Sequence, residues 1–208
     1  MLRISQAASS DAGTGGAVWP AASVTCRWLA RHADPLQGTS VLELGCGTGA
    51  CGLFAAGLGA KRVLLTDNSE SVLQNARRNI ADCAMQTGSC YVEAQRLSFG
   101  DSTLPAGRFD WVLASDCVYG TEWKALAQTL RALLLRQADS PPRVILAIPH
   151  RHPGALLSES FLANAKGLRL VTLDVERAPE HNGGQRSSEA GAPTETVAVH
   201  VVEVKLDR

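Results

Sequence analysis

The sequence predicts an α/β fold built on a seven-stranded, mostly parallel sheet with helices on both faces. Two observations support this prediction. Short apolar runs typical of buried strands alternate with stretches whose apolar residues recur at helical spacing. Near the C-terminus two long strand-like runs follow one another without a helix between them, so this pair is expected to form an antiparallel hairpin.

The first half of the chain predicts helices and strands in alternation. Strands are expected at residues 40–44, 62–66 and 90–93, and helices at 19–31, 50–58 and 69–83. Pro20 suits the first turn of its helix, and Asp67 and Asn68 are suited to cap the helix over 69–83. This order is typical of βαβ units.

The second half continues the alternation. Strands are expected at 109–114 and 144–148, helices at 122–136 and 155–166, and the hairpin strands at 168–175 and 196–206. A polar, glycine-rich stretch over 179–193 is expected to be a flexible loop between the last two. Because ligands of such sheets bind beyond the carboxyl ends of the strands, functional residues are expected just after them.

Length and composition predict one domain. The 208 residues are 45% hydrophobic, so residues 16–208 are expected to form a single domain after a disordered tail over 1–15. Lys and Arg number 20 and Asp and Glu number 20, which disfavours a nucleic-acid partner. No run reaches the roughly 18 to 20 apolar residues of a membrane span. The six cysteines form no CxxC pair, which favours a cytoplasmic protein, with the nucleus as a further compartment. We expect a monomer.

The loop after the first strand is the clearest functional motif, and it reads Glu43-Leu44-Gly45-Cys46-Gly47-Thr48-Gly49. Its glycines let the backbone turn sharply and approach a ligand. By itself the motif also fits a dinucleotide-binding fingerprint, with Asp67 placed to bind ribose hydroxyls. S-adenosylmethionine is favoured over NAD, because a carboxylate at Glu43 would attract a cationic amino acid and repel a pyrophosphate. One short sheet also leaves no room for a second nucleotide-binding half.

Other motifs add specificity to this interpretation. They are GAVWPAA at 16–22, VLELGCGTG at 41–49, TD at 66–67, LSFG at 97–100 and ASDCVY at 114–119. Together they resemble methyltransferase family 16, the protein-lysine methyltransferase branch of the Rossmann-like seven-strand methyltransferases. The resemblance runs over 16–148, roughly two thirds of the chain, and is most specific in VWPAA and DxxY. It implies S-adenosyl-L-methionine as the cofactor and a lysine side chain of a specific protein as the methyl acceptor.

The resemblance also implies roles for individual residues. The cofactor would contact Trp19, Glu43, Gly45, Cys46, Gly47, Asp67, Asn68, Phe99 and Ser115. Asp116 and Tyr119 would form the catalytic motif on the acceptor side. Phe99 stands where the family usually has tryptophan, so its contact with adenine would lack the indole N–H. His150 and His152 have no third ligand near them in the sequence, and no metal site is expected.

Methyl transfer to lysine sets a chemical requirement. A lysine ammonium has no lone pair, so the site must favour the neutral amine by desolvation and hydrogen-bond acceptors. Asp116 and Tyr119 have suitable chemistry. The sequence leaves two alternatives open: the same cofactor serving a small molecule or RNA, and a non-catalytic interaction module with a methyltransferase fold.

Overall fold

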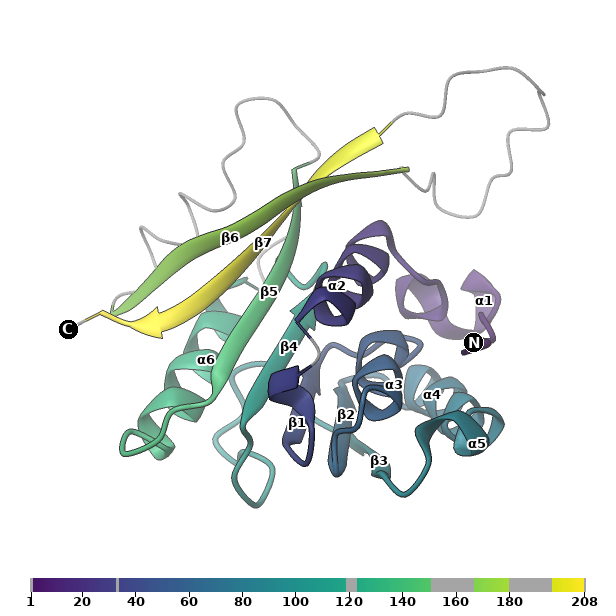
Figure 1. Ribbon diagram of the computed structural model, residues 1–208. Helices are drawn as coiled ribbons and strands as arrows, with labels where there is room; N and C mark the ends of the chain where they lie inside the picture. The colour runs from purple at the N-terminus through teal and green to yellow at the C-terminus, as the bar shows by residue number, and fades with distance from the viewer. Residues whose placement is uncertain (1, 33, 119–122, 151–166, 180–195, 208) are drawn as a thin grey trace.

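A computed structural model describes residues 2–32, 34–118, 123–150, 167–179 and 196–207, within which seven strands form one sheet (Figure 1). The strands are β1 (Ser40–Leu44), β2 (Arg62–Asp67), β3 (Tyr91–Arg96), β4 (Trp111–Ser115), β5 (Arg143–His150), β6 (Leu168–Pro179) and β7 (Thr196–Leu206). Their order across the sheet is β3-β2-β1-β4-β5-β7-β6. The strands from β3 to β5 in this order are parallel, whereas β7 pairs antiparallel with both β5 and β6. The predicted sheet and its terminal hairpin are confirmed.

Helices cover both faces of the sheet (Figure 1). They are α1 (Ser9–Ala12), α2 (Pro20–Arg31), α3 (Ala50–Gly57), α4 (Glu70–Asp82), α5 (Ala84–Thr87) and α6 (Trp123–Arg136), with 3₁₀ turns η1 (Gly13–Gly16) and η2 (Asp34–Leu36). Residues of α2, α3 and α4 pack in one apolar core, and those of α6 pack in a second core on the other face. None of the described helices is long and apolar enough to cross a membrane.

Alternation along the strands assigns side chains to these two cores. In β1, Val41 packs in the core beside α2 and α3, while Leu42 and Leu44 pack in the core beside α6. The same alternation turns Glu43 toward α3, where its Oε2 accepts a hydrogen bond from Gly52 N at 2.8 Å. Glu43 is thereby directed into the protein interior.

The predicted elements agree with the structure to within a few residues, but the cap of α4 differs. Ser69 is the cap residue, and its Oγ accepts from Val72 N at 3.5 Å. The prediction that Asp67 and Asn68 cap this helix was wrong, because β2 extends through Asp67 and α4 begins only at Glu70. The helix predicted over 155–166 and residues 180–193 of the predicted loop lie outside the described residues.

The N-terminal segment differs from the disordered tail expected over 1–15. Residues 2–16 have defined positions beside α4. Ser5 N donates to Asn79 Oδ1 at 2.8 Å, and Ala7 N donates to Gly16 O at 2.9 Å. Ala12 is buried. The physical reason is that buried side-chain amides of α4 satisfy the backbone of this segment, which composition alone does not reveal.

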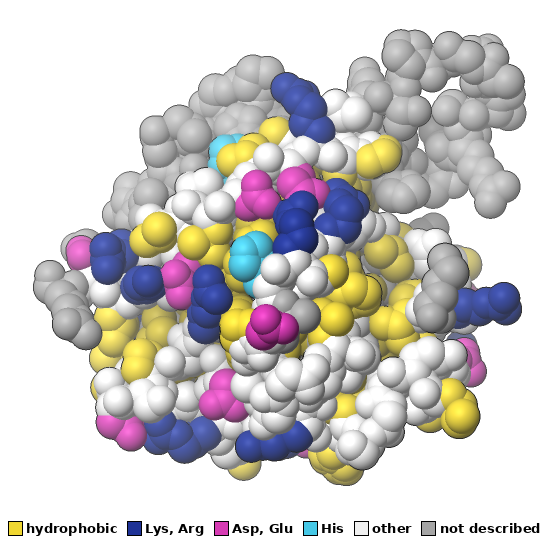
Figure 2. Space-filling view, viewed as in Figure 1, with side chains coloured by type: hydrophobic (Ala, Val, Ile, Leu, Met, Phe, Trp, Pro, Cys, Tyr) yellow, Lys and Arg dark blue, Asp and Glu magenta, His cyan; other side chains and the backbone are white. Residues whose placement is uncertain are grey.

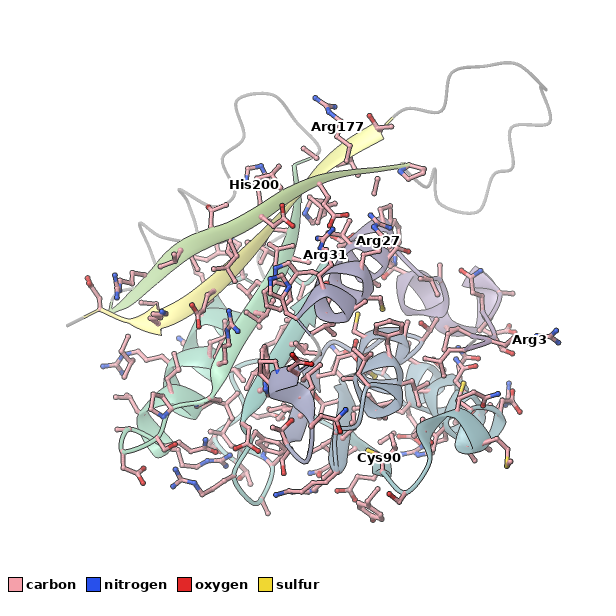
Figure 3. All side chains as sticks on the ribbon, in the orientation of Figure 1. Arg3, Arg27, Arg31, Cys90, Arg177 and His200 are labelled. Atoms are coloured by element: carbon pink, nitrogen blue, oxygen red, sulfur yellow. The ribbon has the colours of Figure 1, made fainter. Side chains whose placement is uncertain are left out.

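Ion pairs join α2 to β6, an edge strand of the described sheet. Arg27 Nη2 lies 2.9 Å from Glu176 Oε2, and Arg31 Nη2 lies 2.8 Å from Asp174 Oδ2. Figure 2 shows basic and acidic side chains gathered on this face, and Figure 3 shows Arg27 and Arg31 directed from α2 toward the hairpin. Such partly exposed pairs contribute at most about 1 kcal/mol each. They nevertheless orient α2, which starts directly after Trp19.

Close packing of α3 on the sheet predicts a large effect of one small substitution. A Cβ added at Gly52 would lie 2.8 Å from Glu43 Oε2 and would also overlap Leu65. Gly52→Ala is therefore expected to lower the free energy of unfolding by about 1–3 kcal/mol, measured by urea denaturation. Gly57→Ala is the matched control, because its Cβ would have no neighbour closer than 3.5 Å. An unchanged Gly52→Ala midpoint would contradict the close contact of α3 with β2.

Candidate active site

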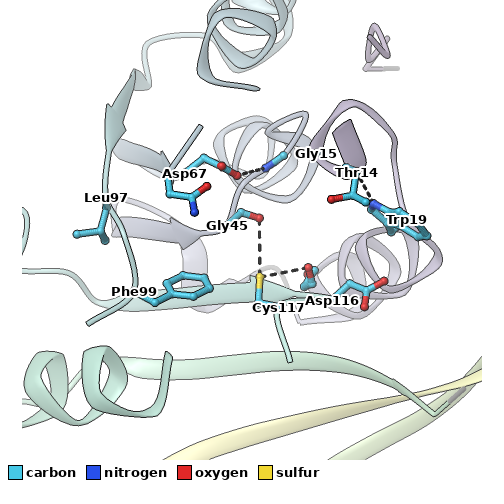
Figure 4. Close-up of a pocket in the computed structure, with 12 residues that line it drawn as sticks. Thr14, Gly15, Trp19, Gly45, Asp67, Leu97, Phe99, Asp116 and Cys117 are labelled. Carbon is cyan, nitrogen blue, oxygen red and sulfur yellow. Dashed lines mark hydrogen bonds between the residues drawn. The ribbon is translucent and has the colours of Figure 1, made fainter. Parts of the chain in front are cut away.

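A cavity lies at the carboxyl ends of β1, β2 and β4, at the edge of the sheet where ligands were expected (Figure 4). Its lining consists of Thr14, Gly15, Trp19, Gly45, Gly47, Asp67, Asn68, Leu97, Phe99, Ser115, Asp116 and Cys117. Most of the residues that the sequence predicted to bind the cofactor or to act in catalysis are among them. The fold therefore gathers residues from separate motifs around one space.

The glycine loop borders this cavity with bare backbone. Gly45, Gly47 and Gly49 have φ angles of 58°, 52° and 79°, a region that glycine adopts without strain. A Cβ added at Gly45 would lie 2.7 Å from Cys117 Sγ, so a larger residue does not fit. Cys46 N donates to Thr66 O at 2.8 Å, which fastens the loop to the end of β2. A ligand can thus approach the main chain closely.

Asp67, the last residue of β2, brings a carboxylate to the cavity. Its Oδ2 accepts from Gly47 N at 3.2 Å, and its Oδ1 accepts from Ser69 N at 3.1 Å. A carboxylate has about four positions for accepting hydrogen bonds. Both oxygens therefore retain the capacity to bind neighbouring hydroxyl groups of a ligand.

Two aromatic side chains stand on opposite sides of the cavity. Figure 4 shows Phe99 with Leu97 on one side and Trp19 with Thr14 on the other. Trp19 Nε1 donates to Thr14 O at 2.8 Å, which orients the indole ring. Phe99 Cζ would lie 3.4 Å from a Cβ at Gly45, so the benzene ring reaches the glycine loop. Phe99 and Leu97 together offer an apolar surface for a flat ring.

Asp116 follows β4 and has an unusual backbone. Among the described residues other than glycine it alone has a positive φ, 58°, a conformation that costs free energy and recurs at functional sites. Its N–H donates to Ala147 O at 2.9 Å. The preceding Ser115 Oγ lies 2.7 Å from Thr25 Oγ1, a hydrogen bond that joins β4 to α2. Hydrogen bonds therefore fix Asp116 to β5 and Ser115 to α2.

One predicted site residue, Tyr119 of the DxxY motif, lies outside the part of the chain that the structure describes. His152 lies outside it as well. The side chain of His150 is likewise not described. Of the two predicted catalytic residues, Asp116 alone can be placed at the cavity.

Glu43 and Cys46, which the sequence predicted to contact the cofactor, are not among the residues that line the cavity. Both are buried, with 2% and 5% of their surface exposed, and Cys46 belongs to the apolar core beside α2 and α3. Burial, followed by the neighbouring Cys51, raises the pKa of Glu43 well above its usual range. Burial thus favours the neutral form of Glu43, whereas the sequence argument assumed a charged carboxylate. Its visible role is to bind Gly52 N and so position α3.

This raised pKa gives a testable pH dependence. Above the ordinary glutamate pKa of about 4.3 and below the raised folded value, folded Glu43 holds a proton that the unfolded chain has released. Its contribution to the free energy of unfolding therefore falls as pH rises through that window. Glu43→Gln, which is neutral at every pH, is expected to gain stability relative to the wild type between pH 5 and pH 8 in urea denaturation. Parallel profiles for the two proteins would show that Glu43 ionises normally.

Four lining residues were not predicted to contact a ligand, namely Thr14, Gly15, Leu97 and Cys117. For Thr14 and Gly15 the sequence offered one signal, the glycine pair that precedes Trp19. The structure explains the glycine at position 15, because a Cβ there would lie 2.6 Å from Val72 Cγ2. Burial raises the pKa of the Cys117 thiol well above its usual range, and its Sγ donates to Leu44 O at 3.3 Å. Cys117 thus serves as a small neutral wall of the cavity.

The sheet order and the cavity at the carboxyl ends of the strands define the class of fold, a Rossmann-like α/β domain. The family model described as lysine methyltransferase matches residues 1–167. The chain belongs to this family, methyltransferase family 16, and the resemblance inferred from the motifs is confirmed. Family membership implies S-adenosylmethionine as the cofactor.

Two relatives are identical to the chain at about a third of the aligned positions. Protein N-lysine methyltransferase METTL21A of Danio rerio is 38% identical over 124 residues, which are 58% of this chain and 56% of that protein. Calmodulin-lysine N-methyltransferase of Arabidopsis thaliana is 33% identical over 156 residues, which are 73% of this chain and 50% of that protein. The chain spans about half the length of these curated relatives.

Solved structures share the fold at low sequence identity. A TehB-like SAM-dependent methyltransferase from Corynebacterium glutamicum matches with a TM-score of 0.55 and 19% identity, over 94% of this chain and 93% of that one. A ribosomal protein L11 methylase from Lactobacillus delbrueckii subsp. bulgaricus matches with a TM-score of 0.51 and 20% identity, over 90% and 77%. These likenesses establish the architecture.

Proposed function

We propose that the chain is an S-adenosylmethionine-dependent protein-lysine N-methyltransferase. The observation that carries this proposal is the cavity in which Asp67 and Asp116 stand at the ends of β2 and β4, on either side of the glycine loop. Membership of the lysine methyltransferase family supports it. Asp67 faces the cofactor in this proposal, and Asp116 faces the incoming lysine.

The residues of the cavity fit this cofactor. Bare backbone at Gly45 and Gly47 leaves room for its amino-acid portion, where a Cβ at Gly45 would instead strike Cys117. The Asp67 carboxylate suits a pair of ribose hydroxyls, and charge-assisted hydrogen bonds of this kind are strong. The apolar side chains of Phe99 and Leu97 suit the adenine ring.

When bound, S-adenosylmethionine would supply a methyl group on a positively charged sulfur: the lone pair of a neutral amine would form a bond to the methyl carbon in line with the carbon–sulfur bond that breaks, and the sulfur would leave as a neutral thioether. Asp116 accepts hydrogen bonds from the lysine nitrogen and stabilises the positive charge that develops on it. Trp19, oriented by its bond to Thr14 O, closes one side of the cavity and limits the access of water. We expect Tyr119 to supply a second polar wall toward the acceptor.

The class of methyl acceptor, the oligomeric state and the cellular compartment are also part of the proposal. The balance of 20 basic and 20 acidic residues favours a protein acceptor over nucleic acid. We also propose that the chain acts as a monomer in the cytoplasm, and also in the nucleus. Light scattering of the purified protein and microscopy of a tagged chain test these two points.

Labelling with radioactive S-adenosylmethionine tests the function. The purified chain is incubated with an extract from cells that lack it, and the products are digested with protease or with nuclease. Label that protease releases, and that mass spectrometry locates on lysine, supports the proposal. Label in RNA or in small molecules would contradict the protein acceptor, and absence of both label and cofactor binding would favour a non-catalytic module.

A further inference from the structure

Asn79 lies outside the cavity lining but bonds to two segments that reach it. This residue of α4 is completely buried. Its Oδ1 accepts from Ser5 N at 2.8 Å, and its Nδ2 donates to Ser5 O at 3.0 Å and to Thr48 O at 2.9 Å. One side-chain amide therefore binds the N-terminal segment and the glycine loop at the same time.

Both of these segments continue directly to the cavity. Thr48 stands between Gly47 and Gly49 in the glycine loop. From Ser5 the N-terminal segment runs to Gly15, and it is closed on itself by the bond from Ala7 N to Gly16 O at 2.9 Å. The segments meet at the cavity, where a Cβ on Gly47 would lie 3.2 Å from Gly15 O. Asn79 thus joins the N-terminal segment and the glycine loop at a point away from the cavity, and the same two segments meet again at the cavity.

The side-chain amide of Asn79 makes three hydrogen bonds, and both of its N–H groups donate. Its oxygen and its nitrogen contact three backbone groups, and a buried amide engaged in this way has one favourable orientation. An apolar replacement would leave those backbone groups without their partner, and a buried unpaired group is costly. The spacing between Ser5 and Thr48 therefore depends on this one side chain.

We infer that Asn79 is a positioning residue for the cofactor: it holds the N-terminal segment and the glycine loop at the spacing that the bound cofactor requires. The inference rests on the proposed function. Since Asn79 bonds to the N-terminal segment and the glycine loop, whereas Asp116 follows β4, its contribution falls on cofactor affinity and not on the methyl-transfer step. Residues 2–16, expected from the sequence to be a loose tail, become part of the cofactor site through this contact.

The matched control is Asn75, one helical turn earlier on α4. Asn75 is also buried, at 4% exposure, and its Nδ2 donates to the same Ser5 O at 3.2 Å. This bond goes to the N-terminal segment and not to the glycine loop. Asn75→Ala therefore removes a buried amide and one bond to the segment, while the link between segment and loop remains.

The experiment compares Asn79→Ala, Asn79→Asp and Asn75→Ala. For both Asn79 variants the Kd and KM of S-adenosylmethionine are expected to rise about tenfold, because aspartate keeps the acceptor for Ser5 N but cannot donate to Thr48 O. The kcat at saturating cofactor and the KM of the protein acceptor are expected to stay within about twofold. Asn75→Ala is expected to change the cofactor Kd by no more than about twofold. Equal effects of Asn75→Ala and Asn79→Ala, or a fall in kcat alone, would overturn the inference.

A measurement on the unaltered chain covers the case in which the variants do not fold. Hydrogen exchange at the amide of Ser5, outside the cavity, is expected to slow when S-adenosylmethionine binds, together with exchange at Gly47. Slowing at Gly47 without slowing at Ser5 would overturn the inference. Absence of any cofactor binding by the unaltered chain would instead contradict the proposed function.

Discussion

Asp116→Asn is expected to lower kcat by about 100-fold or more while the Kd of S-adenosylmethionine changes by less than about threefold. Asparagine keeps the size of the side chain and tolerates the positive φ of 58°. It loses the negative charge that would stabilise the lysine nitrogen as it becomes positive. The loss should therefore appear in turnover with the protein acceptor and not in calorimetry with the cofactor.

The controls for this prediction separate chemistry from backbone strain. Asp116→Ala removes the carboxylate and adds strain at a positive φ, so it is expected to abolish labelling and also to lower the melting temperature. Asp110→Asn changes a carboxylate at the opposite end of β4, where Oδ2 accepts from Ser40 N at 2.8 Å, and should retain activity. Full turnover by Asp116→Asn would remove this carboxylate from the mechanism.

Asp67→Ala is expected to raise the Kd of S-adenosylmethionine by about 100-fold or more. Two charge-assisted hydrogen bonds to ribose hydroxyls would be lost, each worth about 1.5–3 kcal/mol when made by an ionised acceptor. The variant also loses the bond from Gly47 N at 3.2 Å, so the glycine loop is less well ordered. Isothermal titration calorimetry measures the change directly.

Asp101→Ala is a suitable comparison for Asp67→Ala. The Asp101 carboxylate also accepts from a loop amide, Ser98 N at 2.9 Å, but it does not line the cavity. Cofactor affinity should be retained in this variant. If Asp67→Ala binds S-adenosylmethionine with the same Kd as Asp101→Ala and the wild type, Asp67 does not contact the ribose.

The strands themselves and the edge of the sheet that holds the cavity could be predicted because their signals are local. Residues 40–44 were expected as a strand and form β1 with the same bounds, since a continuous apolar run ending at glycines is specific in itself. The parallel order placed Asp67 and Asp116 at one edge of the sheet without any knowledge of contacts. Motif likeness then suggested which ligand this edge holds.

Features that depend on contacts between distant residues could not be predicted. Strand alternation in β1 turns Glu43 into the core, whereas the motif alone suggested a charge beside the ligand. The ordering of the N-terminal segment depends on bonds between Ser5 and Asn79, which lie 74 residues apart. The position of β7 between β5 and β6 likewise depends on tertiary contacts, since the sequence indicates only that β6 and β7 pair.

That insertion of β7 has a consequence for synthesis of the chain. Strand β5 leaves the ribosome well before its partner β7, and β6 has no place in the sheet until β7 is made. During this interval the growing chain carries a complete cavity edge but an open, apolar β5 edge, which is a template for pairing with another nascent chain. A stop codon before residue 196 should therefore produce aggregated protein or dimers that pair through β5, although the residues described around the cavity would all be present.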